Sequence, residues 1–285
     1  MSAISIGPIA MPVGRALLLI ALGVALIVGR LSARRRDVPI VDKLIVLALV
    51  AIVAARVTFV LRYWGHYVSS PLSIIDIRDG GFESFGGLIA MAVYASVVAY
   101  RWPAMRRPLA ISLLAGGLVW GGASGGLHLL QPNQMTRPDM PLVRLDGGAT
   151  TLDELAAEAP GAPMVVNFWA SWCPPCRAEM PMLTAAQKAR SGVSFVFVNQ
   201  GEPRDKIRNF LKTEAISPHN MLIDDDQELA RAANVQAFPT TLFFAADGHL
   251  VDRHMGLLSR ATLARALNRI DNTTTQNQRN TKERS

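Results

Sequence analysis

Hydrophobic positions are arranged differently in the first 130 residues and in the rest of the chain. The first part holds long apolar stretches at Pro12–Gly29, Val38–Leu61, Gly86–Tyr100 and Leu109–Leu130. Most of them approach the roughly 20 residues that a membrane-spanning helix needs. They have almost no amphipathic period, which disfavours the alternative of buried helices in a soluble protein. The pattern predicts an α-helical membrane region of about four transmembrane helices over residues 1–130.

After residue 130 the pattern changes to short apolar runs that alternate with amphipathic segments. A polar, proline-containing linker is expected over 131–141. The runs predict strands at 163–170, 193–199, 221–223, 240–245 and 249–255, and helices at 173–190, 204–214, 227–233 and 260–270. Asp247-Gly248 predicts a hairpin between the last two strands. We therefore expect an α/β domain with a mixed sheet over 142–270.

Two acidic or polar segments complete this organisation. The acidic run at 224–226 is expected to cap the helix that begins at 227, and a cation site is the weaker alternative. Residues 271–285 are polar and repetitive, so we expect a disordered tail there.

Charge adds an orientation to the membrane region. The formal net charge is +7, and Arg residues gather at 30–37 and 101–107, between apolar stretches. Arg-rich loops mark the cytoplasmic side of a membrane, so both loops place everything after about residue 131 in the periplasm of a bacterial inner membrane. Residues 1–11 carry no Lys or Arg, which favours a retained first helix with its N-terminus outside over a signal peptide. No basic face with interleaved aromatics is seen, so we expect no nucleic-acid partner.

The only two cysteines of this chain, Cys173 and Cys176, lie three residues apart between an expected strand and an expected helix. They are too few for a disulfide-stapled scaffold, and the five His do not cluster near them as zinc ligands would. We therefore expect no metal and no cofactor. Cysteines at this spacing can close a small disulfide, and the unpaired N–H groups of a helix N-terminus stabilise a thiolate at Cys173. A thiolate is the attacking species in disulfide exchange, and Cys176 is suited to resolve the mixed disulfide.

The residues around this pair resemble a known superfamily. The run Trp172-Cys173-Pro174-Pro175-Cys176 follows a strand, and Phe238-Pro239-Thr240 opens the next-to-last strand some sixty residues later. Together they resemble the thioredoxin superfamily, which implies that Pro239 is cis and packs beside the disulfide. Pro174 and Pro175 suit the first helical positions, where a missing N–H matters little. Trp172 and Phe238 are the expected aromatic neighbours of the active site.

Within that superfamily, residues 167–181 and Pro239-Thr240-Thr241 resemble the TlpA-like, cytochrome-maturation type of membrane-tethered reductase, over about residues 140–270. Asn167 stands where cytosolic thioredoxins carry a buried Asp. Glu179 matches an acidic residue that some members place near the disulfide. The resemblance makes Glu179 a candidate proton handler, and a solvated Glu on the helix surface is the alternative.

The membrane region resembles part of the prolipoprotein diacylglyceryl transferase family, through Ala55-Arg56, Pro71 and the run from Gly80 to Ile89. That family usually has a His where this chain has Phe85, and its later Arg- and Asn-containing signature has no match here. We interpret this half as a degenerate or truncated relative that retains the capacity to bind lipid or a lipoprotein segment. Arg56 lies inside the second apolar stretch, where a charge costs about 2.5–3.5 kcal/mol, so it is a functional candidate unless it snorkels to the membrane surface.

Three functions are compatible with these features. The first is a membrane-anchored periplasmic thiol:disulfide oxidoreductase, which resemblance favours as a reductase of protein disulfides. A dithiol oxidase would use the same residues, because direction depends on reduction potential. The third is a lipid- or lipoprotein-processing enzyme with an accessory thioredoxin-like domain. The expected partners are protein thiols or disulfides, inner-membrane lipid and, because the membrane half has no cysteine, an external membrane electron donor.

Overall fold

The computed structural model describes residues 3–6, 9–34, 38–68, 71–130 and 135–282. The chain divides into two compact units, one formed by Met11–Pro132 and the other mainly by Asn133–Ser285. A two-stranded sheet of β1 (Ala3–Ile6) and β2 (Ile9–Pro12), which the sequence did not predict, precedes the first helix.

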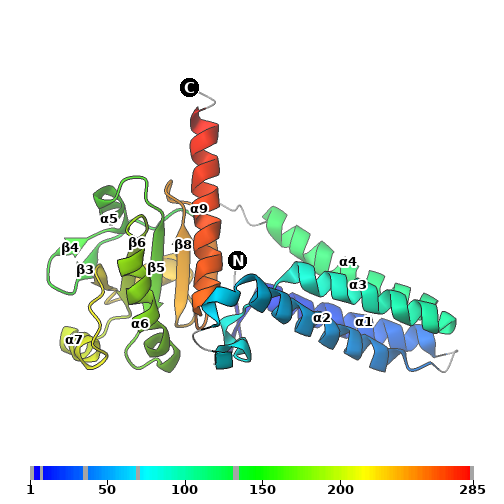
Figure 1. The fold of residues 1–285 in the computed structure, drawn as a ribbon. Coiled ribbons are helices and arrows are strands. Elements are labelled where there is room, and N and C mark those ends of the chain that lie inside the picture. Colours follow the sequence, from blue (N-terminus) through cyan, green and yellow to red (C-terminus); the bar gives the residue numbers. More distant parts are fainter. Residues whose placement is uncertain (1–2, 7–8, 35–37, 69–70, 131–134, 283–285) are drawn as a thin grey trace. The chain divides into compact units, whose positions relative to one another are not determined.

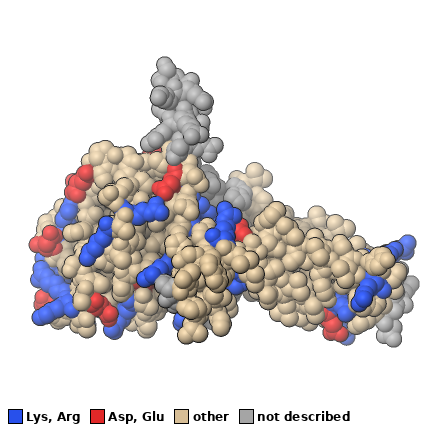
Figure 2. All heavy atoms as spheres, viewed as in Figure 1, with Lys and Arg blue, Asp and Glu red and all other residues tan. Residues whose placement is uncertain are grey.

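The first unit is built from four long helices: α1 (Val13–Ala33), α2 (Ile40–Arg62), α3 (Ser84–Arg101) and α4 (Arg106–Leu130). The four candidate membrane spans coincide with these helices and are long and apolar enough to cross a bilayer, which confirms the four predicted stretches. Figure 2 shows the visible surface of this unit mostly without charged side chains, apart from a cluster near one end. Short 3₁₀ helices follow α2, at Trp64–His66, Pro71–Ile74 and Ile77–Asp79, and one precedes α4, at Pro103–Met105.

Small residues let these helices pack closely, with α1 along α4 and α2 along α3 (Figure 1). A Cβ placed on Gly116 of α4 would lie 3.2 Å from the carbonyl oxygen of Ala21, and one on Gly87 of α3 would lie 2.9 Å from that of Ala51. Close backbone approach through small residues is the usual way in which apolar helices associate without a hydrophobic driving force.

The end of α1 and the start of α2 lie at the same end of the bundle as the junction of α3 and α4. The evidence is one apolar cluster that contains Ala33, Ile40, Val98 and Leu109, all buried. The two Arg-rich segments of the sequence therefore flank helices at a common end, as the orientation argument requires.

The second unit contains a mixed seven-stranded sheet in the order β4-β3-β7-β6-β5-β8-β9. The strands are β3 (Leu142–Arg144), β4 (Ala149–Thr150), β5 (Met164–Trp169), β6 (Ser194–Asn199), β7 (Met221–Ile223), β8 (Thr240–Phe244) and β9 (Leu250–Met255). Strands β5, β6 and β7 are parallel to one another, and the other pairs are antiparallel. Every residue of the central strand β5 is buried, including its one polar residue, Asn167, as its mainly apolar run predicts.

Helices cover both faces of this sheet (Figure 1). One face packs against α6 (Pro174–Ala189), α7 (Arg204–Thr213) and α9 (Arg260–Lys282) around Val165, Trp169 and Phe195. The other packs against α5 (Leu152–Glu158) and α8 (Glu228–Ala232) around Val166 and Phe168. Alternate residues of β5 thus enter opposite cores, and the expected α/β architecture is confirmed.

The expected strands and helices of this unit agree with the structure to within a few residues, except at the end of α9. The acidic run behaves as expected, because buried Asp224 accepts the backbone N–H groups of Leu229 and Ala230 at 3.2 and 2.9 Å and so caps α8. Strands β3 and β4 and helix α5 were not predicted. Helix α5 carries a readable signal, a capping box between Thr151 and Glu154.

The structure differs from the sequence interpretation at both edges of this unit. Helix α9 continues to Lys282, so the described residues after 270 are helical and not a disordered tail. An ion pair between Arg190 and Asp271 at 3.3 Å supports the first turn of this extension. In the expected linker, Thr136 pairs with His249 and the Arg137 N–H donates to the Gly248 carbonyl at 3.0 Å, so residues from 135 onward are part of the folded unit. Residues 131–134 and 283–285 lie outside the described residues.

Candidate active site: a buried cysteine pair beside a cis proline

A four-residue turn carries the chain from β5 to the first cysteine. The Cys173 N–H donates to the Ala170 carbonyl at 3.2 Å, and α6 begins one residue later, with Cys173 as its N-cap. Cys173 and Cys176 form a disulfide, with Cα atoms 5.3 Å apart. Cys173 is 4% exposed and Cys176 is fully buried. The structure thus brings the two sequence-predicted cysteines together as their spacing indicated.

The start of α6 provides the electrostatic setting for a thiolate. The Cys176 N–H donates to Cys173 Sγ at 3.4 Å, and Pro174 and Pro175 occupy the first helical positions. Prolines are tolerated at these positions because the N–H groups that they lack would have no partner within the helix. The remaining N–H groups and the helix dipole favour a negative charge at Cys173. This arrangement stabilises the sulfur anion that disulfide exchange requires.

Pro239 lies at the same end of the sheet. The Phe238–Pro239 peptide bond is cis, as the resemblance implied. Pairing of Phe168 with Thr240 places Pro239 opposite the end of β5, from which the cysteine turn leaves. Trp172 is 66% exposed, and its ring packs edge-on against that of Phe238 with centroids 6.3 Å apart. The disulfide, the proline loop and an exposed aromatic side chain therefore lie at the same end of the sheet.

Glu179 is buried beneath this surface. Its side chain lies on α6, and the residue is only 1% exposed, so the alternative of a solvated surface Glu is wrong. The Asn167 side-chain amide donates to Oε1 at 2.8 Å and the Leu258 backbone N–H donates to Oε2 at 2.8 Å. Burial raises the pKa of Glu179 from 4.5 to about 7, and these two hydrogen bonds act in the opposite direction.

Asn167 connects this carboxyl group to the proline-loop strand. Its amide nitrogen also donates to the Thr241 hydroxyl at 2.9 Å. Glu179 lies three residues after Cys176, a spacing that puts two side chains on the same face of a helix. A carboxyl group that titrates near neutral pH at this position is equipped to accept or return a thiol proton.

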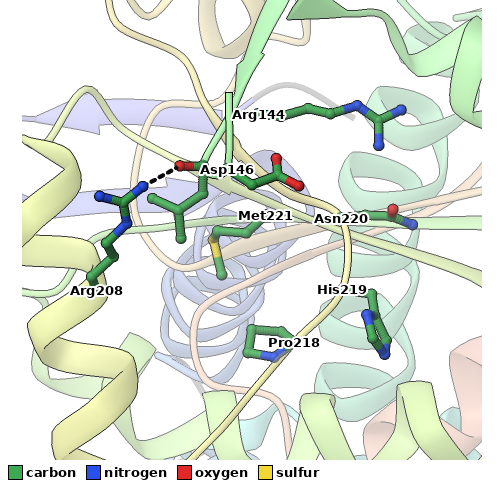
Figure 3. Close-up of a pocket in the computed structure, with 8 residues that line it drawn as sticks. Arg144, Asp146, Arg208, Pro218, His219, Asn220 and Met221 are labelled. Carbon is green, nitrogen blue, oxygen red and sulfur yellow. Dashed lines mark hydrogen bonds between the residues drawn. The ribbon is translucent and has the colours of Figure 1, made fainter. Parts of the chain in front are cut away.

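A separate pocket of about 280 Å³ lies in the same unit, beside β3, β7 and α7 (Figure 3). Arg144, Arg208 and His219 are among its lining residues, and Arg208 Nη2 donates to the Leu145 carbonyl at 3.1 Å. Arg144 is paired with Glu158 at 2.7 Å. None of the sequence-predicted site residues lines this pocket, so it is not part of the cysteine site.

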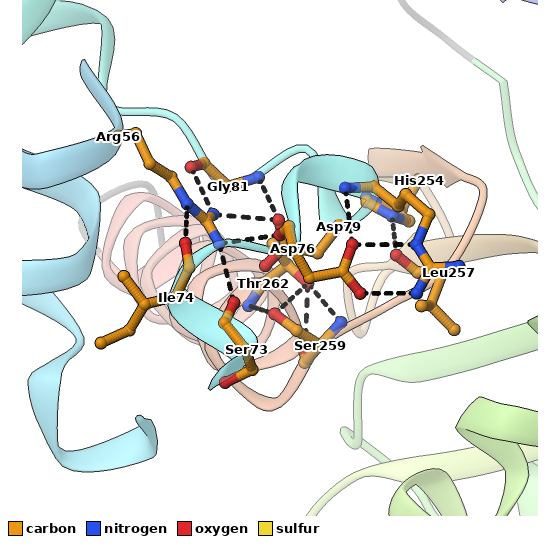
Figure 4. A network of polar contacts seen from close by, with 11 residues as sticks. Arg56, Ser73, Ile74, Asp76, Asp79, Gly81, His254, Leu257, Ser259 and Thr262 are labelled. Atoms are coloured by element: carbon orange, nitrogen blue, oxygen red, sulfur yellow. Dashed lines mark hydrogen bonds and ion pairs between the residues drawn. The ribbon is translucent and has the colours of Figure 1, made fainter. Parts of the chain in front are cut away.

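Arg56, the membrane candidate, is buried on α2 and faces the loop between α2 and α3 (Figure 4). It does not snorkel into water. Its guanidinium has five N–H donors, and five protein oxygens accept them: the carbonyls of Ile74, Gly81, Ser73 and Asp76, and Oδ1 of Asp79. Its hydrogen-bonding capacity is thus fully used in holding this loop against the helix.

Replacing Arg56 with Gln is expected to destabilise the helical unit by about 3–5 kcal/mol, because buried Asp79 would lose its ion-pair partner. Thermal unfolding of the detergent-solubilised chain, with limited proteolysis of the loop at 71–81, measures this effect. Arg78→Gln is the matched control, since Arg78 pairs with Asp76 on the surface of the same loop. Equal unfolding midpoints for the two variants would show that Arg56 does not hold the loop.

Sequence reasoning missed Glu202, which contacts the cysteine turn from the loop after β6. A signal was present, because the carboxyl ends of neighbouring parallel strands meet at one edge of a sheet. Strands β5 and β6 are such neighbours, so an acidic residue shortly after β6 is expected to approach the turn after β5. The contact itself could not be derived from local pattern.

Comparison with known proteins agrees with this geometry. The Redoxin family matches residues 133–268, and the Prolipoprotein diacylglyceryl transferase family matches residues 2–127. The thiol:disulfide interchange protein DsbE homolog of Paracoccus denitrificans is 33% identical over 166 residues, which cover 55% of this chain and 87% of the relative. The thiol:disulfide interchange protein HelX of Rhodobacter capsulatus is 30% identical and is covered to 89%, against 53% of this chain.

A third relative is the thiol-disulfide oxidoreductase ResA of Bacillus subtilis, 30% identical over 112 residues. That match covers 39% of this chain and 62% of the length of ResA. The chain therefore belongs to the thiol-disulfide oxidoreductases with a redoxin, thioredoxin-like domain. Its N-terminal half is a membrane region similar to prolipoprotein diacylglyceryl transferase.

Proposed function

We propose that this protein is a periplasmic reductase of protein disulfides, anchored in the bacterial inner membrane by its four helices. The observation that carries this proposal is the Cys173–Cys176 disulfide at the start of α6, at the same end of the sheet as cis-Pro239 and on the same helix as buried Glu179. The family relationship supports the chemistry, and the two Arg-rich segments at one end of the helices support the orientation.

In the reduced enzyme, the Cys173 thiolate attacks one sulfur of a substrate disulfide. A new S–S bond joins Cys173 to that sulfur, and the other substrate sulfur leaves as a thiolate that takes up a proton. Cys176 then loses its proton to the Glu179 carboxylate and attacks Cys173 Sγ, which releases the second substrate sulfur. The substrate has gained two electrons, and the enzyme is left with the Cys173–Cys176 disulfide.

Regeneration requires a thiol donor from outside this chain. Both cysteines of the chain belong to the active pair, so the membrane helices have no thiol with which to relay electrons. The partners that this mechanism implies are protein disulfides on the periplasmic side and a separate membrane protein that returns the pair to the dithiol form.

Reduction of insulin disulfides by the detergent-solubilised chain tests the chemistry. With dithiothreitol as electron source, we expect precipitation of the insulin B chain well before it occurs with dithiothreitol alone. Labelling of intact cells with a membrane-impermeant maleimide tests both side and direction, since only a periplasmic, reduced Cys173 reacts. If the chain does not accelerate insulin reduction by dithiothreitol, the proposed reductase activity is wrong. A pair that is oxidised in growing cells would favour the dithiol oxidase.

A lipid-modifying role is suggested by the family match over residues 2–127. Two observations argue for an anchor instead. Phe85 stands at the position of the family's usual His and is 70% exposed, and its ring cannot accept a proton. All five N–H donors of the Arg56 guanidinium bind protein oxygens. We therefore expect no complementation of cells that lack their own diacylglyceryl transferase.

A further inference from the structure

The turn that presents Cys173 is held from the side by one carboxylate. Glu202, in the loop between β6 and α7, accepts both hydrogen-bond donors of Ser171, which is the second residue of the turn. The Ser171 backbone N–H donates to Oε2 at 2.6 Å, and the Ser171 hydroxyl donates to Oε1 at 2.5 Å. The residue two positions before the nucleophilic cysteine is thus fixed in both its backbone and its side chain.

The loop that carries Glu202 is itself tightly constrained. Asn199 donates from Nδ2 to Glu202 Oε2 at 2.8 Å and accepts the Glu202 backbone N–H on Oδ1 at 3.0 Å. Gly201 between them has φ +70°, and a Cβ there would lie 2.7 Å from the Asp225 carbonyl oxygen. The Gln200 N–H donates to the Trp169 carbonyl at 3.1 Å, which ties this loop to the end of β5. The backbone that carries Glu202 is therefore held in one conformation.

The side-chain contacts of Glu202 suit a carboxylate, which accepts hydrogen bonds on both of its oxygens. Three donors converge on its two oxygens: the Ser171 N–H, the Ser171 hydroxyl and the Asn199 amide. All three of these donors are neutral groups. A Gln at this position would direct its own NH₂ group at a donor, and a buried mismatched donor is more unfavourable than a lost contact.

We propose that Glu202 is a positioning residue for disulfide exchange, which holds the Ala170–Cys173 turn so that Cys173 is aligned with an incoming disulfide. The disulfide ring restrains Cys173 only in the oxidised enzyme. In the dithiol form, where Cys173 must attack, that ring is open, and the Glu202–Ser171 contacts are left to hold the turn together with the packing of Trp172 on Phe238. In-line attack on sulfur depends on such alignment, and small misplacements of a reacting group slow a reaction strongly. The inference rests on the exchange activity proposed above.

The test compares Glu202→Gln with Glu158→Gln in the full chain. Glu158 is an exposed carboxylate of the same unit that pairs with Arg144, so the same chemical change is made away from the turn. For Glu202→Gln we expect kcat/KM for insulin reduction to fall about tenfold, which corresponds to about 1.4 kcal/mol. We also expect the pH midpoint of Cys173 alkylation to move down, because a nearby negative charge is removed. Glu158→Gln should match the parent in both measurements.

Ser171→Ala is a milder change that separates slower catalysis from loss of folding, because it removes one hydrogen bond and leaves Glu202 in place. It should lower kcat/KM about threefold and lower the unfolding midpoint less than Glu202→Gln does, because the carboxyl group keeps its other two donors. Parental kcat/KM and alkylation profiles in Glu202→Gln, or a parental rate in Ser171→Ala, would overturn the positioning role. A parent chain that shows no exchange would instead reject the proposed function, while the alkylation profile would still test the influence of Glu202 on Cys173.

Discussion

Replacement of Cys173 by Ser is expected to reduce insulin-disulfide reduction to the rate of dithiothreitol alone. A serine hydroxyl at the start of α6 is not ionised near neutral pH and forms no bond to sulfur that exchange could resolve. The same change at Cys176 has a different outcome. Cys173 remains at the helix N-terminus and attacks, but the buried resolving thiol is missing, so a mixed disulfide with the substrate accumulates.

Non-reducing electrophoresis and mass spectrometry of the two variants distinguish these outcomes. Each variant serves as the control for the other, because both lose the internal disulfide and only one loses the proposed nucleophile. Full activity of Cys173→Ser would remove the cysteine pair from the mechanism. Trapping of substrate by Cys173→Ser, with none by Cys176→Ser, would exchange the roles of the two cysteines.

Replacement of Glu179 by Gln is expected to remove a pH-dependent component of about 3 kcal/mol from the stability of the oxidised domain. Burial raises the pKa of Glu179 to about 7, from an ordinary value of 4.5, so the folded protein binds this proton more tightly than the unfolded chain. The associated stability is fully present below about pH 4.5 and is lost as pH rises through 7. A difference of this size in pKa corresponds to about 3 kcal/mol.

Urea unfolding of the oxidised chain at pH 5, 7 and 8, followed by near-ultraviolet circular dichroism, measures this component. The parent should lose stability across the series, and Glu179→Gln should show a shallower decline. Gln has one acceptor oxygen for the two donors, Asn167 and Leu258, so a constant loss is expected at every pH in addition. Glu158→Gln, an exposed carboxylate, should keep the parental slope. Parallel slopes for parent and Glu179→Gln would show that Glu179 does not titrate in this range.

The Glu179→Gln variant also tests the proposed role of this carboxyl group in resolving the mixed disulfide. In Glu179→Gln the carboxyl group that we propose as acceptor of the Cys176 proton is lost, so resolution of the mixed disulfide is expected to be slower than attack by Cys173. Stopped-flow measurement of the two steps separates this role from a purely structural one, which would slow both steps equally.

Local pattern was enough to predict the elements on which the protein is built. The four long helices follow from apolar stretches whose length matches a bilayer, and β5 follows from a mainly apolar run that is buried on both faces. The redox pair is equally local, since Cys173 and Cys176 are separated by less than one helical turn. The short strands β3 and β4 escaped prediction because two or three residues carry too little periodicity to be recognised.

For residues that the sequence left open to two interpretations, contacts between distant parts of the chain decided the environment of the side chain. Glu179 could have been a surface residue until Leu258, 79 positions later, was seen to donate to it in the core. Arg56 could have reached water until Asp79 and the carbonyls of the following loop were seen to surround it. Glu202 had no assigned role until the parallel pairing of β5 with β6 placed it beside Ser171, 31 positions earlier.

The sequence by itself determined the four long apolar helices, the main strands and helices that follow the linker, and the pair of cysteines that forms the disulfide, because each depends on residues that are neighbours along the chain. Tertiary structure alone decided that the Glu179 carboxyl group is buried with a raised pKa, that Glu202 contacts the cysteine turn, and that Arg56 binds the loop after α2. Burial and hydrogen bonding depend on what the fold brings to a side chain, and no local pattern contains that information.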